Sequence, residues 1–191
     1  ARTKFFRKFF KIMNAETKKK IDFKVEVLKK INKTDLADLC NITEQAIEAG
    51  GGFGWLKMPP REILNKYWKG LALIENRKLI VGRLNNAIAG TLQVKFQPSN
   101  NEAQQNTIYI NSHFVAPWAR GYGLAKAMID KAEKVGVENN SFCAQLDVRE
   151  TQIAAIQLFR SKGYTQWGTN PNYASADGNI IKGFYFLKAL K

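Results

Sequence analysis

The order of hydrophobic and polar residues divides the chain into strands and helices from residue 23 onward. Apolar and polar residues alternate over 23–31, which predicts a strand with one buried face. Thr34 is expected to cap the first helix, glycines 50–52 to end it, and Pro59-Pro60 to begin the second. In chain order we expect a strand at 23–31, helices from 34 and from 59, strands at 78–84, 87–96 and 107–115, a helix at 123–135, a strand at 144–148, a helix at 153–163, and two strands between 164 and 190.

This order predicts an α/β fold, with a mixed, mostly antiparallel sheet flanked by helices. Asn85 and Asn86 separate two of the strands and are typical of a tight hairpin turn, because asparagine tolerates positive φ. Residues 170–179 are rich in Asn, Pro and Gly and are expected to form a loop. A chain of 191 residues fits one domain, so we expect a single domain over 23–191 after an arm at 1–22.

Positive charge is concentrated at the start of the chain. The formal net charge is +14, and residues 1–33 hold 12 Lys and Arg against 3 Asp and Glu. Such an arm could attract nucleic acid, an anionic membrane or an acidic partner. Its phenylalanines also suit docking on the body of the protein, and on this interpretation we expect no nucleic-acid partner and no membrane contact.

The apolar runs and the cysteines narrow the class of protein further. No run approaches the ~20 uninterrupted apolar residues of a membrane span. Cys40 and Cys143 have the spacing of neither a disulfide framework nor a metal site. We therefore expect a cytoplasmic protein that uses no metal.

A glycine-containing loop between an expected strand and an expected helix carries the clearest functional pattern. Residues 120–125 read RGYGLA. The N–H groups and the dipole at the start of a helix favour an anion, and glycine lets a phosphate approach the backbone. The loop matches neither a P-loop nor a dinucleotide fingerprint, in which Lys126 would have to be glycine. It therefore predicts a diphosphate site of another kind, with a turn that binds nothing as the alternative.

The same residues resemble the Q/R-x-x-G-x-G/A signature of the GNAT acetyltransferase superfamily. Residues 148–164 resemble the family's V-x-x-x-N-x-x-A-I-x-L-Y-x-x-x-G-F segment, and residues 87–94 resemble its G-T-x-x-L strand. The likeness extends over about residues 23–190. It implies the GNAT, or acyl-CoA N-acyltransferase, fold.

Residues 49–70 and 170–190 are similar to the subgroup that includes the tabtoxin-resistance acetyltransferases. The resemblance implies an N-acetyltransferase that moves acetyl from acetyl-CoA to a primary amine of a small molecule by direct attack. It also implies that the strand at 107–115 splays from its neighbour and binds the pantetheine arm. The residues that it implies for binding acetyl-CoA are Phe114, Val115, Arg120, Gly121, Tyr122, Gly123, Leu124, Ala125, Gln152 and Phe159.

Two departures from the family pattern leave the catalytic acid and base open. Phe159 stands where the family commonly has a tyrosine, and phenylalanine has no proton to give. Gln152 replaces an asparagine. Asp147 could serve as a base or an ammonium anchor, or it could be a structural carboxylate. The candidate catalytic residues are Asp147, His113, Tyr109 and Tyr164, with Tyr173 as a further possible proton donor.

The acceptor side is less defined by the sequence. Phe53 and Trp55 follow the glycine run and are expected to border an acceptor pocket together with Tyr173, although both could be core residues. A CoA-binding module with little or no catalysis and a protein or peptide N-acetyltransferase are the alternative functions. The family resemblance leaves a homodimer open.

Overall fold

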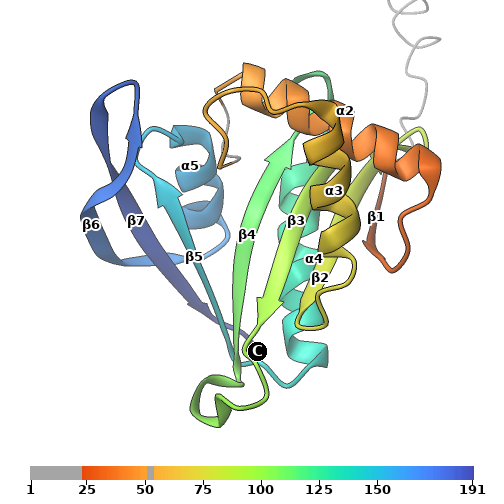
Figure 1. The fold of residues 1–191 in the computed structure, drawn as a ribbon. Helices are drawn as coiled ribbons and strands as arrows, with labels where there is room; N and C mark the ends of the chain where they lie inside the picture. Colours follow the sequence, from red (N-terminus) through yellow and green to blue (C-terminus); the bar gives the residue numbers. More distant parts are fainter. Residues whose placement is uncertain (1–22, 51–53) are drawn as a thin grey trace, which may run out of the picture.

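The computed structural model describes residues 23–50 and 54–191, so the arm at 1–22 and the predicted acceptor residue Phe53 lie outside the described residues. Within these residues, seven strands form one sheet in the order β1-β2-β3-β4-β5-β7-β6, and only the β4–β5 pair is parallel (Figure 1). The predicted mixed, mostly antiparallel α/β fold is confirmed. The elements are β1 (Phe23–Leu28), α2 (Lys33–Glu48), α3 (Arg61–Leu71), β2 (Arg77–Leu84), β3 (Ala87–Phe96), η1 (Glu102–Gln104), β4 (Thr107–Val115), η2 (Pro117–Ala119), α4 (Leu124–Glu138), β5 (Cys143–Arg149), α5 (Ile153–Ser161), β6 (Thr165–Ala176) and β7 (Asn179–Ala189).

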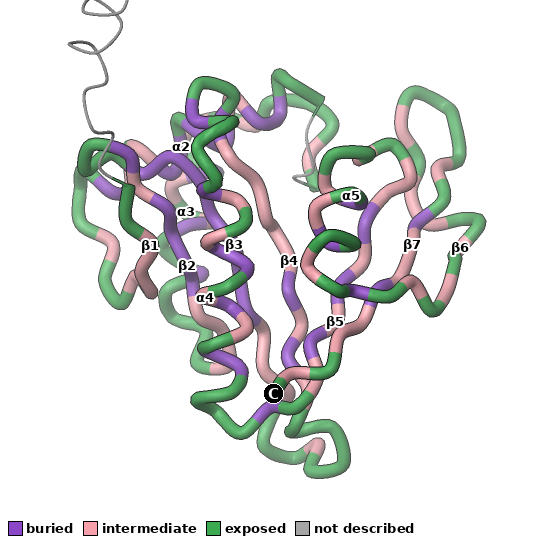
Figure 2. Tube along the Cα trace, turned by 180° about the vertical axis from the view of Figure 1, so that it is seen from behind, coloured by how far each residue is buried: buried purple, intermediate pink, exposed green. Residues whose placement is uncertain are grey.

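Helices cover the two faces of the sheet unequally. α2 and α3 lie over β2, β3 and β4 on the face seen in Figure 1, and α4 and α5 lie on the opposite face, seen in Figure 2. Buried apolar residues of both layers, such as Trp68 of α3 and Met128 of α4, belong to one core. No helix formed by the described residues is long and apolar enough to cross a membrane. The face of β5, β7 and β6 opposite α5 carries no helix of the described part of the chain (Figure 1).

The structure corrects two expectations about local structure. Asn32 caps α2 in place of Thr34, because its side chain accepts a hydrogen bond from the N–H of Asp35 at 2.8 Å. Residues 170–176, expected in a loop, belong to β6, which pairs with β7 around an irregular stretch between Asn170 and Ala174. The turn between β6 and β7 is therefore short. In the β2–β3 hairpin, the predicted turn at Asn85 and Asn86 is confirmed by their positive φ angles of 48° and 72°.

Two glycines let α4 begin close to the sheet. Gly82 of β2 and Gly90 of β3 pair with each other. A Cβ on Gly82 would lie 2.6 Å from Leu124 Cγ, and a Cβ on Gly90 would lie 2.9 Å from the carbonyl oxygen of Phe114. Side chains at these two positions would push the first turn of α4 and the end of β4 away from the sheet.

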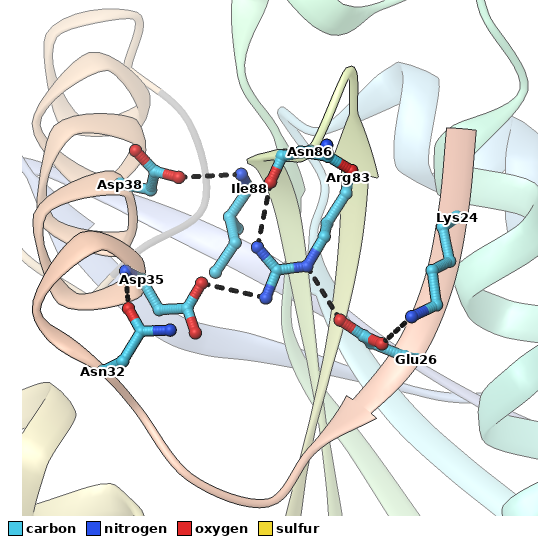
Figure 3. Close-up of polar contacts among 8 residues, drawn as sticks. All are labelled: Lys24, Glu26, Asn32, Asp35, Asp38, Arg83, Asn86 and Ile88. Atoms are coloured by element: carbon cyan, nitrogen blue, oxygen red, sulfur yellow. Dashed lines mark hydrogen bonds and ion pairs between the residues drawn. The ribbon is translucent and has the colours of Figure 1, made fainter. Parts of the chain in front are cut away.

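A half-buried ion network ties α2 to the edge of the sheet (Figure 3). The Arg83 guanidinium contacts Glu26 of β1 at 2.7 Å and Asp35 of α2 at 2.8 Å, and donates to the carbonyl oxygen of Asn86 at 3.0 Å. The Asp38 carboxylate accepts from the N–H of Ile88 at 3.0 Å. The side chain of Asp35 is only 5% exposed, so its charge depends on Arg83 for compensation.

Replacing Arg83 by methionine is expected to lower the free energy of unfolding by about 3 kcal/mol, because it leaves the buried Asp35 carboxylate without its cation. Urea unfolding at pH 7 measures the loss. Lys66→Met is the matched control, because Lys66 forms an exposed ion pair with Glu62 on α3 and its removal should cost less than about 0.5 kcal/mol. Equal losses in the two variants would contradict this view of the network.

Candidate active site

A bulge in β4 opens the sheet between β4 and β5. The pairs Thr91–Phe114 and Gln93–Asn111 enclose one more residue on β4 than on β3. Within the bulge Ser112 has a φ of +48°, and its carbonyl oxygen accepts from Thr91 Oγ1 at 3.1 Å. Such a bulge bends its strand. β4 consequently pairs with β5 only from Thr107 to Tyr109, and the two strands diverge beyond that point (Figure 1).

The loop that follows β4 presents a row of backbone N–H groups. Among the described residues, the N–H groups of residues 121–126 have no hydrogen-bond acceptor, and we call this segment the amide cradle. Gly121 and Gly123 have φ angles of +87° and +80°, which L-residues with a side chain rarely adopt. A Cβ on either glycine would meet no atom of the described residues within 4 Å, so this part of the chain leaves the cradle open to a ligand. Unpaired amides and a positive dipole at a helix start favour an anionic group.

The space between the diverging strands is a pocket of about 100 Å³. Its walls include Asn111 and His113 of β4, Asp147 of β5, Gln152, and Phe159 of α5. Asn111 Oδ1 and His113 Nε2 are buried and have no hydrogen-bond partner among the residues that the structure describes. Because a buried polar atom without a partner is costly, these two atoms suit the polar groups of a ligand.

Asp147 of β5 accepts hydrogen bonds from two tyrosines, one on the neighbouring β4 and one on β6, beyond β7. The Tyr109 hydroxyl donates to Oδ1 and the Tyr173 hydroxyl donates to Oδ2, and we call these three residues the Asp147 cluster. Burial, together with the hydrogen bond to Asp147, raises the pKa of both tyrosines above the ordinary value. Tyr173 reaches Asp147 across Gly183, where a Cβ would collide with the tyrosine ring. Asp147 and Tyr173 also line the pocket, so the cluster and the pocket form one site.

The sequence and the fold both have known relatives. Residues 41–164 match the model of the acetyltransferase (GNAT) family. The chain belongs to this family. It is an N-acetyltransferase that uses acetyl-CoA, as the sequence predicted.

Three relatives illustrate the likeness. An uncharacterized N-acetyltransferase encoded in the hisH-hisA intergenic region of Azospirillum brasilense is 44% identical over 131 residues, which are 69% of this chain and 78% of that protein. The catalytic subunit naa20 of the N-terminal acetyltransferase B complex of Schizosaccharomyces pombe is 30% identical over 102 residues, which are 53% of this chain and 52% of that protein. The structure of yncA from Salmonella typhimurium with its cofactor acetyl-CoA has a TM-score of 0.71 and 15% identity, over 88% of this chain and 94% of that chain.

The site of this GNAT acetyltransferase fits acetyl-CoA on its own geometry. The amide cradle offers donors for a pyrophosphate, and Arg120 beside it is exposed. Phe114 and Val115 pair with β3 on one side and border the opening toward β5 on the other. Asn111 and His113, whose buried polar atoms have no partner among the described residues, line the same pocket as Asp147.

The structure brings most of the predicted site residues of the acetyltransferase together, but not all of them. Tyr164 is buried against Phe159 outside the pocket, where burial and the neighbouring Glu133 raise its pKa. Trp55 packs edge-on against Tyr67, with ring centroids 5.4 Å apart, and does not line the pocket. Gln152 lines the pocket and donates to the carbonyl oxygen of Gly50 at 3.4 Å. The predicted residues that line the pocket are His113, Asp147, Gln152, Phe159 and Tyr173.

Three residues of the site were missed from the sequence. Asn111 and Ser112 form the bulge and part of the pocket wall, but asparagine and serine do not by themselves predict a bulge in a strand. Gly183 admits Tyr173, and a glycine inside an apolar strand was a usable sign of close approach.

His113 makes the stability of this acetyltransferase depend on pH. Burial lowers the pKa of His113 to about 4, with a hydrogen bond to the backbone of Ala125 acting in the opposite direction. The unfolded chain takes up this proton near pH 6.5 and the folded chain only near pH 4, so a fall in pH through this interval favours unfolding. We expect His113 to lower the free energy of unfolding by about 3 kcal/mol as the pH falls from 7 to 4.

The measurement is urea unfolding of the wild type and of His113→Gln at pH 7 and at pH 4. The variant should lose about 3 kcal/mol less than the wild type over this range. Parallel losses in the two proteins would show that His113 is protonated in the folded state well above pH 4.

Proposed function

We propose that this acetyltransferase acetylates the primary amine of a small molecule, which attacks the thioester of acetyl-CoA directly. The observation that carries the proposal is that the pocket between β4 and β5 is lined by Asp147 and Tyr173 of the Asp147 cluster and by His113, which hydrogen-bonds to the backbone of Ala125 in the amide cradle. The likeness of residues 49–70 and 170–190 to tabtoxin-resistance acetyltransferases also supports a small acceptor.

Acetyl-CoA supplies an activated acyl group when it is bound. We assign the pyrophosphate to the amide cradle with Arg120, and the pantetheine arm to the edge of β4 at Phe114 and Val115. Gln152 and Phe159 border the pocket on the side of α5. Phe159 is 2% exposed, so it excludes water from this side of the pocket.

Amide formation removes two protons from the acceptor ammonium, one before the attack and one as the thiolate departs. Asp147 is assigned to hold the ammonium and to accept the first proton, and the second passes to solvent. A carboxylate near an ammonium is a suitable base when it lies within hydrogen-bond reach. Tyr109 and Tyr173 fix the carboxylate in place. Their raised pKa values make them poor donors to a thiolate, whose ordinary pKa is about 8.5, so the departing thiolate takes its proton from solvent.

His113 is assigned to the pocket wall rather than to catalysis. With a pKa of about 4 it is neutral at pH 7, so it carries no charge with which to hold an ammonium. Its unpartnered Nε2 can still accept a hydrogen bond from a bound group.

A peptide α-amine is the second candidate acceptor. The likeness to naa20, a catalytic subunit of an N-terminal acetyltransferase complex, favours it. The two candidate acceptors would use the same acetyl-CoA site. They differ only in the molecule, small amine or peptide, that binds on the open face beside Asp147.

Release of free thiol from acetyl-CoA, measured across a panel of primary amines and short peptides, tests the proposal. We expect amine-dependent thiol release, an N-acetylated product by mass spectrometry, and peptides slower by about tenfold or more in kcat/KM. Turnover confined to peptides would establish the second candidate. Acetyl-CoA binding without thiol release on any acceptor would leave only a CoA-binding module.

A further inference from the structure

An aromatic surface adjoins the Asp147 cluster on β6 and β7. Trp167 is 59% exposed, and its ring centroid lies 5.5 Å from that of Tyr185. The Tyr185 ring lies 6.3 Å from the Tyr173 ring, and Tyr185 opposes Asp147 directly in the β5–β7 register. We call Tyr173, Tyr185 and Trp167 the aromatic platform. Aromatic residues gathered outside the core, next to a pocket, are typical of a binding surface.

Irregular backbone in β6 places two members of the platform. The register shifts between Gln166 and Gly168, which makes Trp167 an extra residue opposite β7. It shifts again between Asn170 and Ala174, in the stretch that contains Tyr173. Bulges of this kind re-aim side chains beside active sites. Together the two register shifts place the rings of Trp167 and Tyr173 beside Tyr185, on the side of the sheet where Asp147 lies.

The platform is accessible and continuous with the pocket. Among residues 23–50 and 54–191, no helix covers the face of β5, β7 and β6 shown in Figure 1. Tyr173 belongs both to the platform and to the pocket lining, so a molecule held at Asp147 can extend over Tyr185 to Trp167 without leaving the surface.

Charge around the platform limits the acceptor to one cationic group. Asp147 supplies a single carboxylate. Arg149, two residues further along β5, lies close enough to lower the pKa of Tyr173 by its charge, although burial dominates and raises that pKa. A polyamine would therefore meet repulsion beyond its first ammonium, whereas an uncharged flat group would bury apolar area on the rings.

We propose that the acceptor is an arylalkylamine, whose ammonium binds Asp147 and whose aromatic ring packs on the aromatic platform. This inference rests on the proposed function and specifies its substrate class. Trp167 and Tyr185 then determine specificity and take no part in the chemistry.

The test compares 2-phenylethylamine with propylamine as acceptors for the full chain. We expect the wild type to favour 2-phenylethylamine in kcat/KM by about tenfold or more, since contact of one ring with an aromatic surface is worth this ratio. Trp167→Ala should raise KM for 2-phenylethylamine by about tenfold, leave kcat within about twofold, and leave propylamine unchanged. Ile180→Ala is the matched control, because Ile180 is 67% exposed on the same hairpin and lies outside the platform.

Calorimetric titration of 2-phenylethylamine into the CoA-bound protein gives a second measurement that needs no turnover. Wild-type binding at least about tenfold tighter than that of propylamine, lost in Trp167→Ala, would support the inference. Equal affinities for the two amines, or a Trp167→Ala variant indistinguishable from wild type, would overturn it. A protein that turns over propylamine but shows no preference for the aryl compound would keep the proposed function and lose this inference alone.

Discussion

Replacing Gly123 by glutamate is expected to weaken acetyl-CoA binding by about a hundredfold or more, because a carboxylate placed beside a diphosphate costs several kcal/mol at a partly exposed site. The substitution also requires a glutamate at a φ of +80° and introduces a side chain where the cradle is open. Calorimetric titration with acetyl-CoA measures the effect directly.

A matched glycine separates loss of binding from loss of fold. Gly178, in the β6–β7 turn, has a φ of +78°, and a Cβ there also meets no atom within 4 Å. Gly178→Glu therefore carries the same backbone strain and the same added charge away from the amide cradle. It should keep wild-type affinity for acetyl-CoA within about threefold. An equal loss in the two variants, or none in Gly123→Glu, would contradict the assignment of the cradle.

Replacing Asp147 by asparagine is expected to lower kcat/KM for the amine by about 10² to 10³, the range typical for removal of a general base. The amide keeps the size of the carboxylate but loses its charge, so it neither holds an ammonium nor accepts its proton. Affinity for acetyl-CoA should change by less than about twofold, since Asp147 lies outside the amide cradle. Initial rates and an acetyl-CoA titration measure the two quantities.

Asp130→Asn is the control for Asp147→Asn. Asp130 is a carboxylate of α4 whose side chain is 52% exposed, and it pairs with Lys162 outside the pocket. It should retain full activity.

The activity remaining in Asp147→Asn should also rise with pH, because the free amine becomes more abundant as an ammonium with an ordinary pKa near 10.4 loses its proton. Activity of Asp147→Asn within about threefold of wild type would exclude Asp147 as the base.

The loop geometry of the proposed donor half could be predicted from the sequence because its features are local. The amide cradle follows from two glycines ahead of a strongly amphipathic helix, and both glycines have the positive φ that such a loop requires. The divergence of β4 and β5 was implied by the family resemblance and is present in the structure. The bulge that causes it was not predictable, because Ser112 adopts its unusual φ through a contact with Thr91, a distant residue.

The acceptor half depends on contacts between strands far apart in the sequence. Tyr109, Asp147 and Tyr173 were each candidates, but their meeting follows from the register of four strands. Residues 170–176 of β6 were taken for a loop because polar residues are exposed at the edge of the sheet, where a strand needs little apolar sequence. Trp167 precedes this stretch and was not singled out, because its place opposite β7 depends on a register shift. Tyr164 was misplaced because its position relative to the pocket depends on how α5 packs against α4.

Backbone amide NMR during a titration with CoA tests the central claim most directly, because it reports on each N–H group of residues 121–126. We predict that these amides, together with those of Phe114 and Val115, undergo the largest chemical-shift changes in the protein, as expected for direct hydrogen bonds to a diphosphate. Saturable binding that leaves the amides of residues 121–126 unshifted and perturbs another surface would contradict the account.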